Sequence, residues 1–130
     1  MINLSKLENI SHTLRKSIFK TVCKRGGHLS TAYSAVEILV SLYFTDILKI
    51  NKKNYNKKDR NFFLLSKGHG ETLLYAVLVE KKIISENQFR NHYRNGSHIL
   101  GGHVDIKTPG IEITSGALGH GLSIGCGIAL

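Results

Sequence analysis

Three histidines of this chain lie in short glycine-containing segments that are spread along its length. The segments are residues 26–28 (Gly-Gly-His), 68–70 (Gly-His-Gly) and 101–103 (Gly-Gly-His), and a fourth glycine-rich run follows at residues 115–121. Glycine lets a backbone approach a ligand closely, while histidine titrates near neutral pH and can carry protons. The pattern therefore predicts one ligand pocket that is built from several loops.

The most specific segment is residues 66–70 (Ser-Lys-Gly-His-Gly), because it directly follows the apolar run 62–65. A strand followed by a glycine turn and a helix is where α/β proteins hold their ligands. The remaining histidines fit ordinary roles. His12 and His92 lie in segments that read as helical, with no glycine beside them. The spacing of His98 from His103 matches no metal signature.

Helical periodicity places these segments between helices. A serine followed three residues later by Glu or Gln marks a helix start, and apolar residues then recur at three- and four-residue spacing. These signals predict helices that begin near Ser5, Ser34, Gly70 and Ser85, the first ending before Gly26 and the second reaching about Leu48. Gly121, Gly125 and Ala129 fall four apart and predict a helix whose small face packs closely against a neighbour.

Two short segments are expected to be strands. Residues 62–65 are continuously apolar, as in a buried parallel strand, and residues 111–114 alternate. Together with the helices they predict an α/β fold in which helices pack on a partial parallel sheet. One or two strands cannot form a doubly covered layer, and the chain stops inside an apolar helix. We therefore expect residues 1–130 to form a single incomplete domain.

Composition favours a cytoplasmic location. The 130 residues are 42% hydrophobic with one proline, which is typical of a folded chain. Cys23 and Cys126 have no paired spacing, and no secretory leader precedes the first helix. No apolar stretch approaches the roughly 18 residues that a membrane span needs. We expect a reduced, cytoplasmic protein that does not enter membranes.

The chain is strongly basic, with 18 Lys and Arg against 9 acidic residues, a net charge of +9. Part of the excess lies in residues 51–60, which lack the helical stripe and aromatic platform of a nucleic-acid surface. A basic surface attracts phosphorylated small molecules by electrostatic steering. The charge thus favours anionic substrates, with a nucleic-acid-binding module as the weaker alternative.

The ordered motifs identify a family. They are residues 27–28, 34–44, 59–60, 64–69, 74–78, 102–105, 109–112 and 115–123. In this order and spacing, the chain resembles the amino-terminal, thiamine diphosphate-binding subunit or domain of transketolase, from about Leu4 to Leu130. The resemblance implies the transfer of a two-carbon ketol unit from a ketose phosphate to an aldose phosphate.

The resemblance also implies roles for named residues. His28 and His103 match the family's histidines that contact donor hydroxyls and shuttle protons, so both are candidate catalytic and substrate-binding residues. His69 matches one beside the diphosphate and the reacting centre. The cofactor-binding residues further include Gly116, Ala117 and Leu118, whose main chain meets the aminopyrimidine ring.

The chain departs from the family pattern in two places near these residues. Leu29 stands where many transketolases have proline, so the segment is also similar to deoxyxylulose-phosphate synthase, which joins pyruvate to glyceraldehyde phosphate. His120 stands where glutamine is common, and its role stays open. An inactive fragment that acts only as a binding remnant is a further alternative.

The family's metal site has no counterpart here, because no aspartate stands between glycines. The ligands of the divalent metal, Mg or Ca, are therefore expected outside this chain. The resemblance implies that the partner is a carboxy-terminal, pyrimidine-binding transketolase subunit, in a dimer or heterotetramer, that donates the activating glutamate. This chain alone is expected to be incomplete and inactive.

Overall fold

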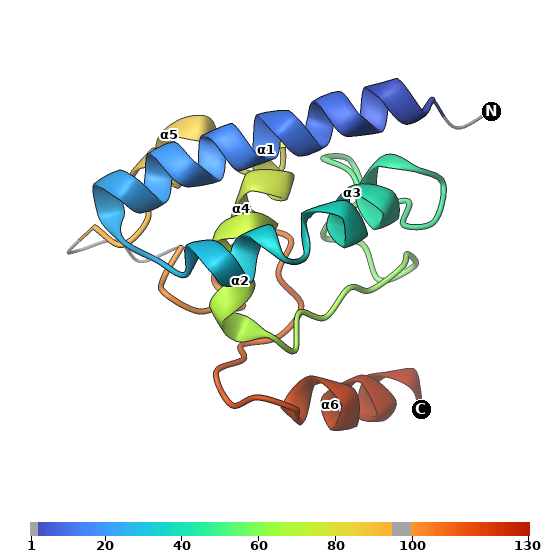
Figure 1. Ribbon diagram of the computed structural model, residues 1–130. Coiled ribbons are helices and arrows are strands. Elements are labelled where there is room, and N and C mark those ends of the chain that lie inside the picture. The colour runs from blue at the N-terminus through green and yellow to red at the C-terminus, as the bar shows by residue number, and fades with distance from the viewer. Residues whose placement is uncertain (1–2, 95–99) are drawn as a thin grey trace.

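The computed structural model describes residues 3–94 and 100–130, and in this part helices joined by long loops make up the fold (Figure 1). The helices are α1 (Leu4–Arg25), α2 (Leu29–Tyr33), α3 (Val36–Phe44), the short 3₁₀ helix η1 (Gly68–Gly70), α4 (Glu71–Glu80), α5 (Glu86–Arg90) and α6 (His120–Ala129). His98 lies outside the described residues.

Helix α1 begins earlier than its sequence signal indicates. The helix starts at Leu4, one residue from the predicted position, and the side chain of Asn3 accepts a hydrogen bond of 3.0 Å from the Lys6 N–H, so Asn3 rather than Ser5 is the cap. Asparagine caps a helix as well as serine does. The helix ends where expected, at Gly26, whose positive φ of 86° suits glycine.

The predicted second helix is α3, which begins at Val36 rather than near Ser34, and a short helix that the sequence did not predict, α2, lies just before it. Ser34 does not cap, because its hydroxyl donates to the Thr31 carbonyl at 3.0 Å. Glu37 turns away to form a paired hydrogen bond with Arg15 of α1, at 2.5 and 2.9 Å. Long-range pairing and a local turn have therefore replaced the predicted capping box. Helix α3 ends at Phe44 rather than near Leu48.

Helix α4 lies at the centre of the molecule, below α1 in Figure 1, and contacts α1, α2, α3 and α5. Every residue from 71 to 78 is buried, as expected for a helix that is covered on all sides. Its neighbours contribute Leu14 and Ile18 from α1 and Tyr43 from α3. The predicted Ser85–Gln88 capping box is confirmed at the start of α5.

The two expected strands are extended segments, but no strand is assigned among residues 3–94 and 100–130. Side chains join them instead of a backbone ladder. The carboxylate of Glu112 pairs with Arg60 at 2.5 Å, and the Ser115 hydroxyl donates to the Leu65 carbonyl at 2.9 Å. A ladder needs two backbones in register, and these two segments form none with each other within residues 3–94 and 100–130.

Helix α6 touches the rest of the chain through its small residues, as predicted. A Cβ on Gly121 would lie 2.4 Å from the Ser66 Cβ, and one on Gly125 would lie 3.9 Å from Leu64. The Gly121 N–H also donates to the Ser66 hydroxyl at 3.1 Å. Figure 1 shows the rest of α6 standing apart from the other helices. No helix of the described chain is both long and apolar enough to cross a bilayer.

Candidate functional site

The imidazole rings of His28, His69 and His103 lie side by side, although they are up to 75 residues apart in the sequence. The ring centroids of His28 and His69 are 5.5 Å apart, with the planes at 77°. Those of His28 and His103 are 6.4 Å apart, at 60°. His28 and His103 are exposed and His69 is half-buried, so the cluster is open to a ligand.

Each ring is held by a different element. His28 is the residue before α2, and the preceding Gly27 has a φ of 128° that side-chain-bearing residues rarely adopt. His69 is the middle residue of η1. The carbonyl of His103 lies 3.0 Å from the Tyr75 hydroxyl, which can donate to it from the central helix α4. Rigid helices therefore support all three loops.

The predicted cofactor-binding segment joins the cluster through Ser115. A Cβ on Gly68 would lie 2.5 Å from the Ser115 carbonyl oxygen, so the turn before His69 packs directly on this segment. The Ser115 N–H donates to the Val104 carbonyl at 3.1 Å, next to His103. Ser115 thus links the His69 loop to the His103 loop.

The next residues, Gly116, Ala117 and Leu118, are exposed. A Cβ on Gly116 would meet no atom within 4 Å, which leaves the backbone open to a flat ligand. An exposed main chain can offer its N–H and C=O groups to a bound molecule. Within residues 3–94 and 100–130, no group of three or more His, Cys, Asp or Glu side chains is arranged to hold a metal ion.

Behind the cluster lies a buried pair that sequence reasoning missed. Glu71, at the start of α4, has no solvent exposure, and burial raises the pKa of its carboxyl group. The hydroxyls of Thr72 and Tyr93 both lie within hydrogen-bonding distance of its Oε1, at 2.9 and 3.2 Å. A glutamate at the head of an otherwise apolar run was the available signal.

The second member of this pair is His92, which corrects the expectation of an ordinary surface helix. His92 lies in a turn after α5 and is completely buried. Burial lowers the pKa of its imidazole to about 4. Aromatic rings pack around it, from Tyr75, Phe89 and Tyr93. Phe89 and Tyr93 are close to His92 in the sequence, but Tyr75 comes from α4, so the burial depends on a contact that no local pattern reveals.

Three other residues considered in the sequence are not part of the histidine cluster: Lys67 makes hydrogen bonds that support α2, and His12 and His120 lie on the surface. The Lys67 ammonium donates to the Ser34 hydroxyl at 2.9 Å and to the Thr31 carbonyl at 3.3 Å, at the end of α2. His120, the first residue of α6, is exposed, as is His12 on α1.

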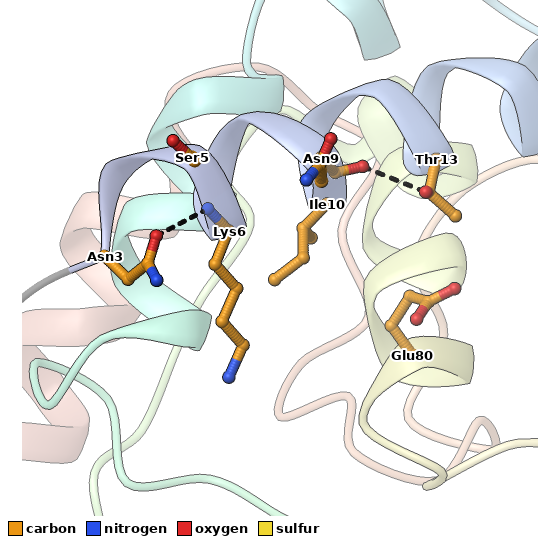
Figure 2. Close-up of a pocket in the computed structure, with 7 residues that line it drawn as sticks. All are labelled: Asn3, Ser5, Lys6, Asn9, Ile10, Thr13 and Glu80. Carbon is orange, nitrogen blue, oxygen red and sulfur yellow. Dashed lines mark hydrogen bonds between the residues drawn. The ribbon is translucent and has the colours of Figure 1, made fainter.

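Two surface hollows lie away from the histidines. Figure 2 shows one, of about 430 Å³, between the first turns of α1 and Glu80 at the end of α4. The other, of about 730 Å³, lies between α1 and α5 and is lined by several basic side chains. Neither contains a residue of the histidine cluster.

Comparison with known proteins places this geometry in context. Residues 8–130 match the family described as transketolase, thiamine diphosphate binding domain. One subunit of the apulose-4-phosphate transketolase of Phocaeicola vulgatus is 40% identical over 132 residues, covering 99% of this chain and 46% of that protein. Human transketolase is 33% identical over 127 residues, covering 97% of this chain and 20% of that protein. The chain thus spans less than half the length of these relatives.

A solved structure shares the arrangement. Transketolase from Leishmania mexicana matches with a TM-score of 0.76 and 28% identity, over 95% of this chain and 18% of that chain. This likeness confirms the α/β class expected from the sequence. The absence of paired strands in residues 3–94 and 100–130 does not conflict with that class.

Proposed function

This chain belongs to the family of transketolase thiamine diphosphate-binding domains, and we propose that it is part of an enzyme that transfers a two-carbon ketol unit from a ketose phosphate to an aldose phosphate. The observation that carries this proposal is the cluster of three imidazoles, with centroid separations of 5.5 and 6.4 Å from His28. Imidazole is suited to proton transfer near neutral pH, because its pKa starts at about 6.5.

Two of the three rings are proposed to handle the donor sugar. His28 and His103 are the exposed members, so both can reach hydroxyl groups of a substrate that enters from solvent. Each can accept a proton from such a hydroxyl and return it. Bound thiamine diphosphate supplies the carbanion chemistry of ketol transfer. The task of the chain is to orient the sugar and to move its protons.

The remaining ring and the exposed main chain are proposed to hold the cofactor. Half-buried His69 lies on the inner side of the cluster, and Gly116, Ala117 and Leu118 offer an uncovered backbone. The divalent metal, Mg or Ca, would then take its ligands from outside this chain. We further propose that residues 1–130 form one incomplete domain that works in the cytoplasm.

A partner chain is proposed to complete the site. The relatives from Phocaeicola vulgatus and Actinobacillus succinogenes are each named as one subunit of a transketolase, which supports a second subunit. That partner would be a carboxy-terminal, pyrimidine-binding chain, in a dimer or heterotetramer. The net charge of +9 supports sugar phosphates as substrates, because it attracts anions.

The proposal is tested by mixing the chain with a candidate partner subunit, magnesium and thiamine diphosphate, and then measuring ketol transfer between sugar phosphates. His103→Ala is expected to abolish turnover while thiamine diphosphate still binds. His12→Ala is the matched control, because His12 is an exposed histidine on α1. Equal turnover in both variants would remove the proton-transfer role of His103.

Leu29 supports a second candidate, a deoxyxylulose-phosphate synthase-like reaction with pyruvate as donor. This residue follows His28 directly and packs partly against the core as the first residue of α2. Offering pyruvate with glyceraldehyde phosphate to the same mixture separates the two reactions. Release of carbon dioxide would favour the synthase, whereas transfer from a ketose phosphate alone would favour the transketolase. No turnover with either donor would favour an inactive binding remnant.

A further inference from the structure

The ring of Tyr93 fills the space between the two glycines that precede His28 and His103. A Cβ on Gly102 would lie 2.7 Å from the Tyr93 Cε1 and Oη atoms, and one on Gly27 would lie 3.8 Å from Cε2. Cε1 and Cε2 are opposite edges of one ring. The ring therefore lies between the two loops, tightly against Gly102 and in ordinary contact range of Gly27, where Thr72 and Val22 lie nearer.

The hydroxyl of Tyr93 connects the same ring to the third loop. It lies 3.2 Å from the Glu71 Oε1 and 3.2 Å from the Gly102 carbonyl, and it can donate to one of them at a time. Glu71 is two residues after His69 and is held rigidly in the buried first turn of α4. Burial raises the pKa of Tyr93 to about 12, so the hydroxyl keeps its proton at neutral pH.

The backbone of Tyr93 is strained, and its surroundings hold it in place. Its φ is 59°, in the left-handed region that residues with large side chains rarely occupy. Such conformations persist where the structure around them determines them, and they concentrate at functional sites. Buried His92 packs against the ring, with the planes at 76° and the centroids 4.2 Å apart. The strain at Tyr93 lies beside the histidine loops, where such conformations concentrate when a residue shapes a site.

We propose that Tyr93 is a positioning residue of the histidine cluster. Its ring sets the separation of His28 and His103, and its hydroxyl lies between the Gly102 carbonyl of the His103 loop and Glu71 beside His69. The catalytic consequence rests on the proposed ketol transfer. The geometric part concerns this chain's own residues and stands or fails separately.

The first test measures the separation of the His28 and His103 rings in crystal structures of variants of the full chain. Tyr93→Ala is expected to move the two rings by more than about 1 Å, whereas Tyr93→Phe keeps the ring and is expected to preserve their separation. Tyr55→Ala is the matched control, because Tyr55 also packs against the core but lies in the loop of residues 51–60. Where Tyr93→Ala does not fold, Tyr93→Leu serves in its place.

The second test is kinetic and uses the chain with its partner subunit. Tyr93→Ala is expected to lower kcat at least tenfold with a smaller change in KM for the acceptor. Tyr55→Ala is expected to lower the melting temperature alone. Gly102→Ala should also lower kcat, but much less in the Tyr93→Ala background, because the atoms that its methyl group meets are then absent.

Three results would overturn the proposal. The first is an unchanged separation of the His28 and His103 rings in Tyr93→Ala or Tyr93→Leu. The others are a kcat of Tyr93→Ala equal to that of Tyr55→Ala, and effects of Gly102→Ala and Tyr93→Ala on kcat that multiply as independent changes do. If the unsubstituted enzyme transfers no ketol unit, the proposed function fails while the ring separation still decides the role of Tyr93.

Discussion

The Nε2 atom of His92 lies 3.8 Å from the Oε1 atom of Glu71, and both side chains are completely buried. Within the part of the chain that the structure describes, neither ring nitrogen of His92 and only one of the two Glu71 carboxylate oxygens has a hydrogen-bond partner that meets strict geometry. Burying ionisable groups without full pairing costs free energy. Both members of the pair contact Tyr93, which in turn contacts the glycine that precedes His103.

The first prediction concerns stability in acid. Burial lowers the pKa of His92 to about 4, against about 6.5 for a histidine in the unfolded chain, so acidification between these values favours the unfolded state, which binds the proton. The stability that neutral, buried His92 gives the folded chain is complete above pH 6.5 and is lost as the pH falls from 6.5 to 4. The loss is about 3 kcal/mol, at about 1.4 kcal/mol per unit. Glu71 has the opposite effect on stability: its pKa is raised in the folded chain, so the folded state takes up a proton more readily than the unfolded state and acidification stabilises it.

A comparison of variants separates the contribution of His92 to the pH dependence of stability from that of the other ionisable groups. Urea unfolding at several pH values should show the wild-type chain losing stability faster on acidification than His92→Phe. The control His12→Phe changes an exposed histidine and should follow the wild-type profile. Parallel profiles for the wild type and His92→Phe would show that His92 takes up no proton on unfolding.

The second prediction concerns the salt bridge of Arg60 and Glu112, which joins two extended segments. Their side chains are only 6% and 9% exposed. Because Arg60→Ala leaves the Glu112 carboxylate buried without its partner, it should cost about 3–5 kcal/mol of unfolding free energy. Arg90→Ala, which breaks the exposed pair with Glu86, should cost no more than about 0.5 kcal/mol. Denaturant melts of the two variants check this difference, and equal costs would contradict it.

The third prediction concerns cofactor affinity. Gly68→Ala places a methyl group 2.5 Å from the backbone oxygen of Ser115, so either the His69 turn or the segment leading to Gly116 must move. We expect thiamine diphosphate to bind at least tenfold more weakly to the assembled enzyme, as measured by calorimetry. Gly127→Ala is the matched control, because its Cβ would meet no atom within 4 Å. Unchanged affinity in Gly68→Ala would show that this contact does not shape the site.

Much of the helical framework was predictable, because its signals are local. The periodic apolar positions of α1 and α4 and the cap at Ser85 depend on residues within one or two turns. The short helix α2 and the start of α3 at Val36 were not predictable in this way. Glu37 is paired with Arg15, a residue 22 positions away, and no local pattern reveals that choice.

The candidate site also has a part that local sequence predicts and a part that it does not. The glycine–histidine segments are visible in the sequence because glycine has few other reasons to recur beside histidine. The support behind them was missed, since Glu71, His92 and Tyr93 meet only after α4 and α5 have packed. The roles of His28, His69 and His103 stay predictions.

The most direct test follows the imidazole resonances of the chain, assembled with magnesium and its partner subunit, while thiamine diphosphate is added. If the cluster surrounds the cofactor, the signals of His28, His69 and His103 shift together with one dissociation constant, and the signal of His12 does not move. A cofactor that binds with none of the three resonances changing would contradict the account.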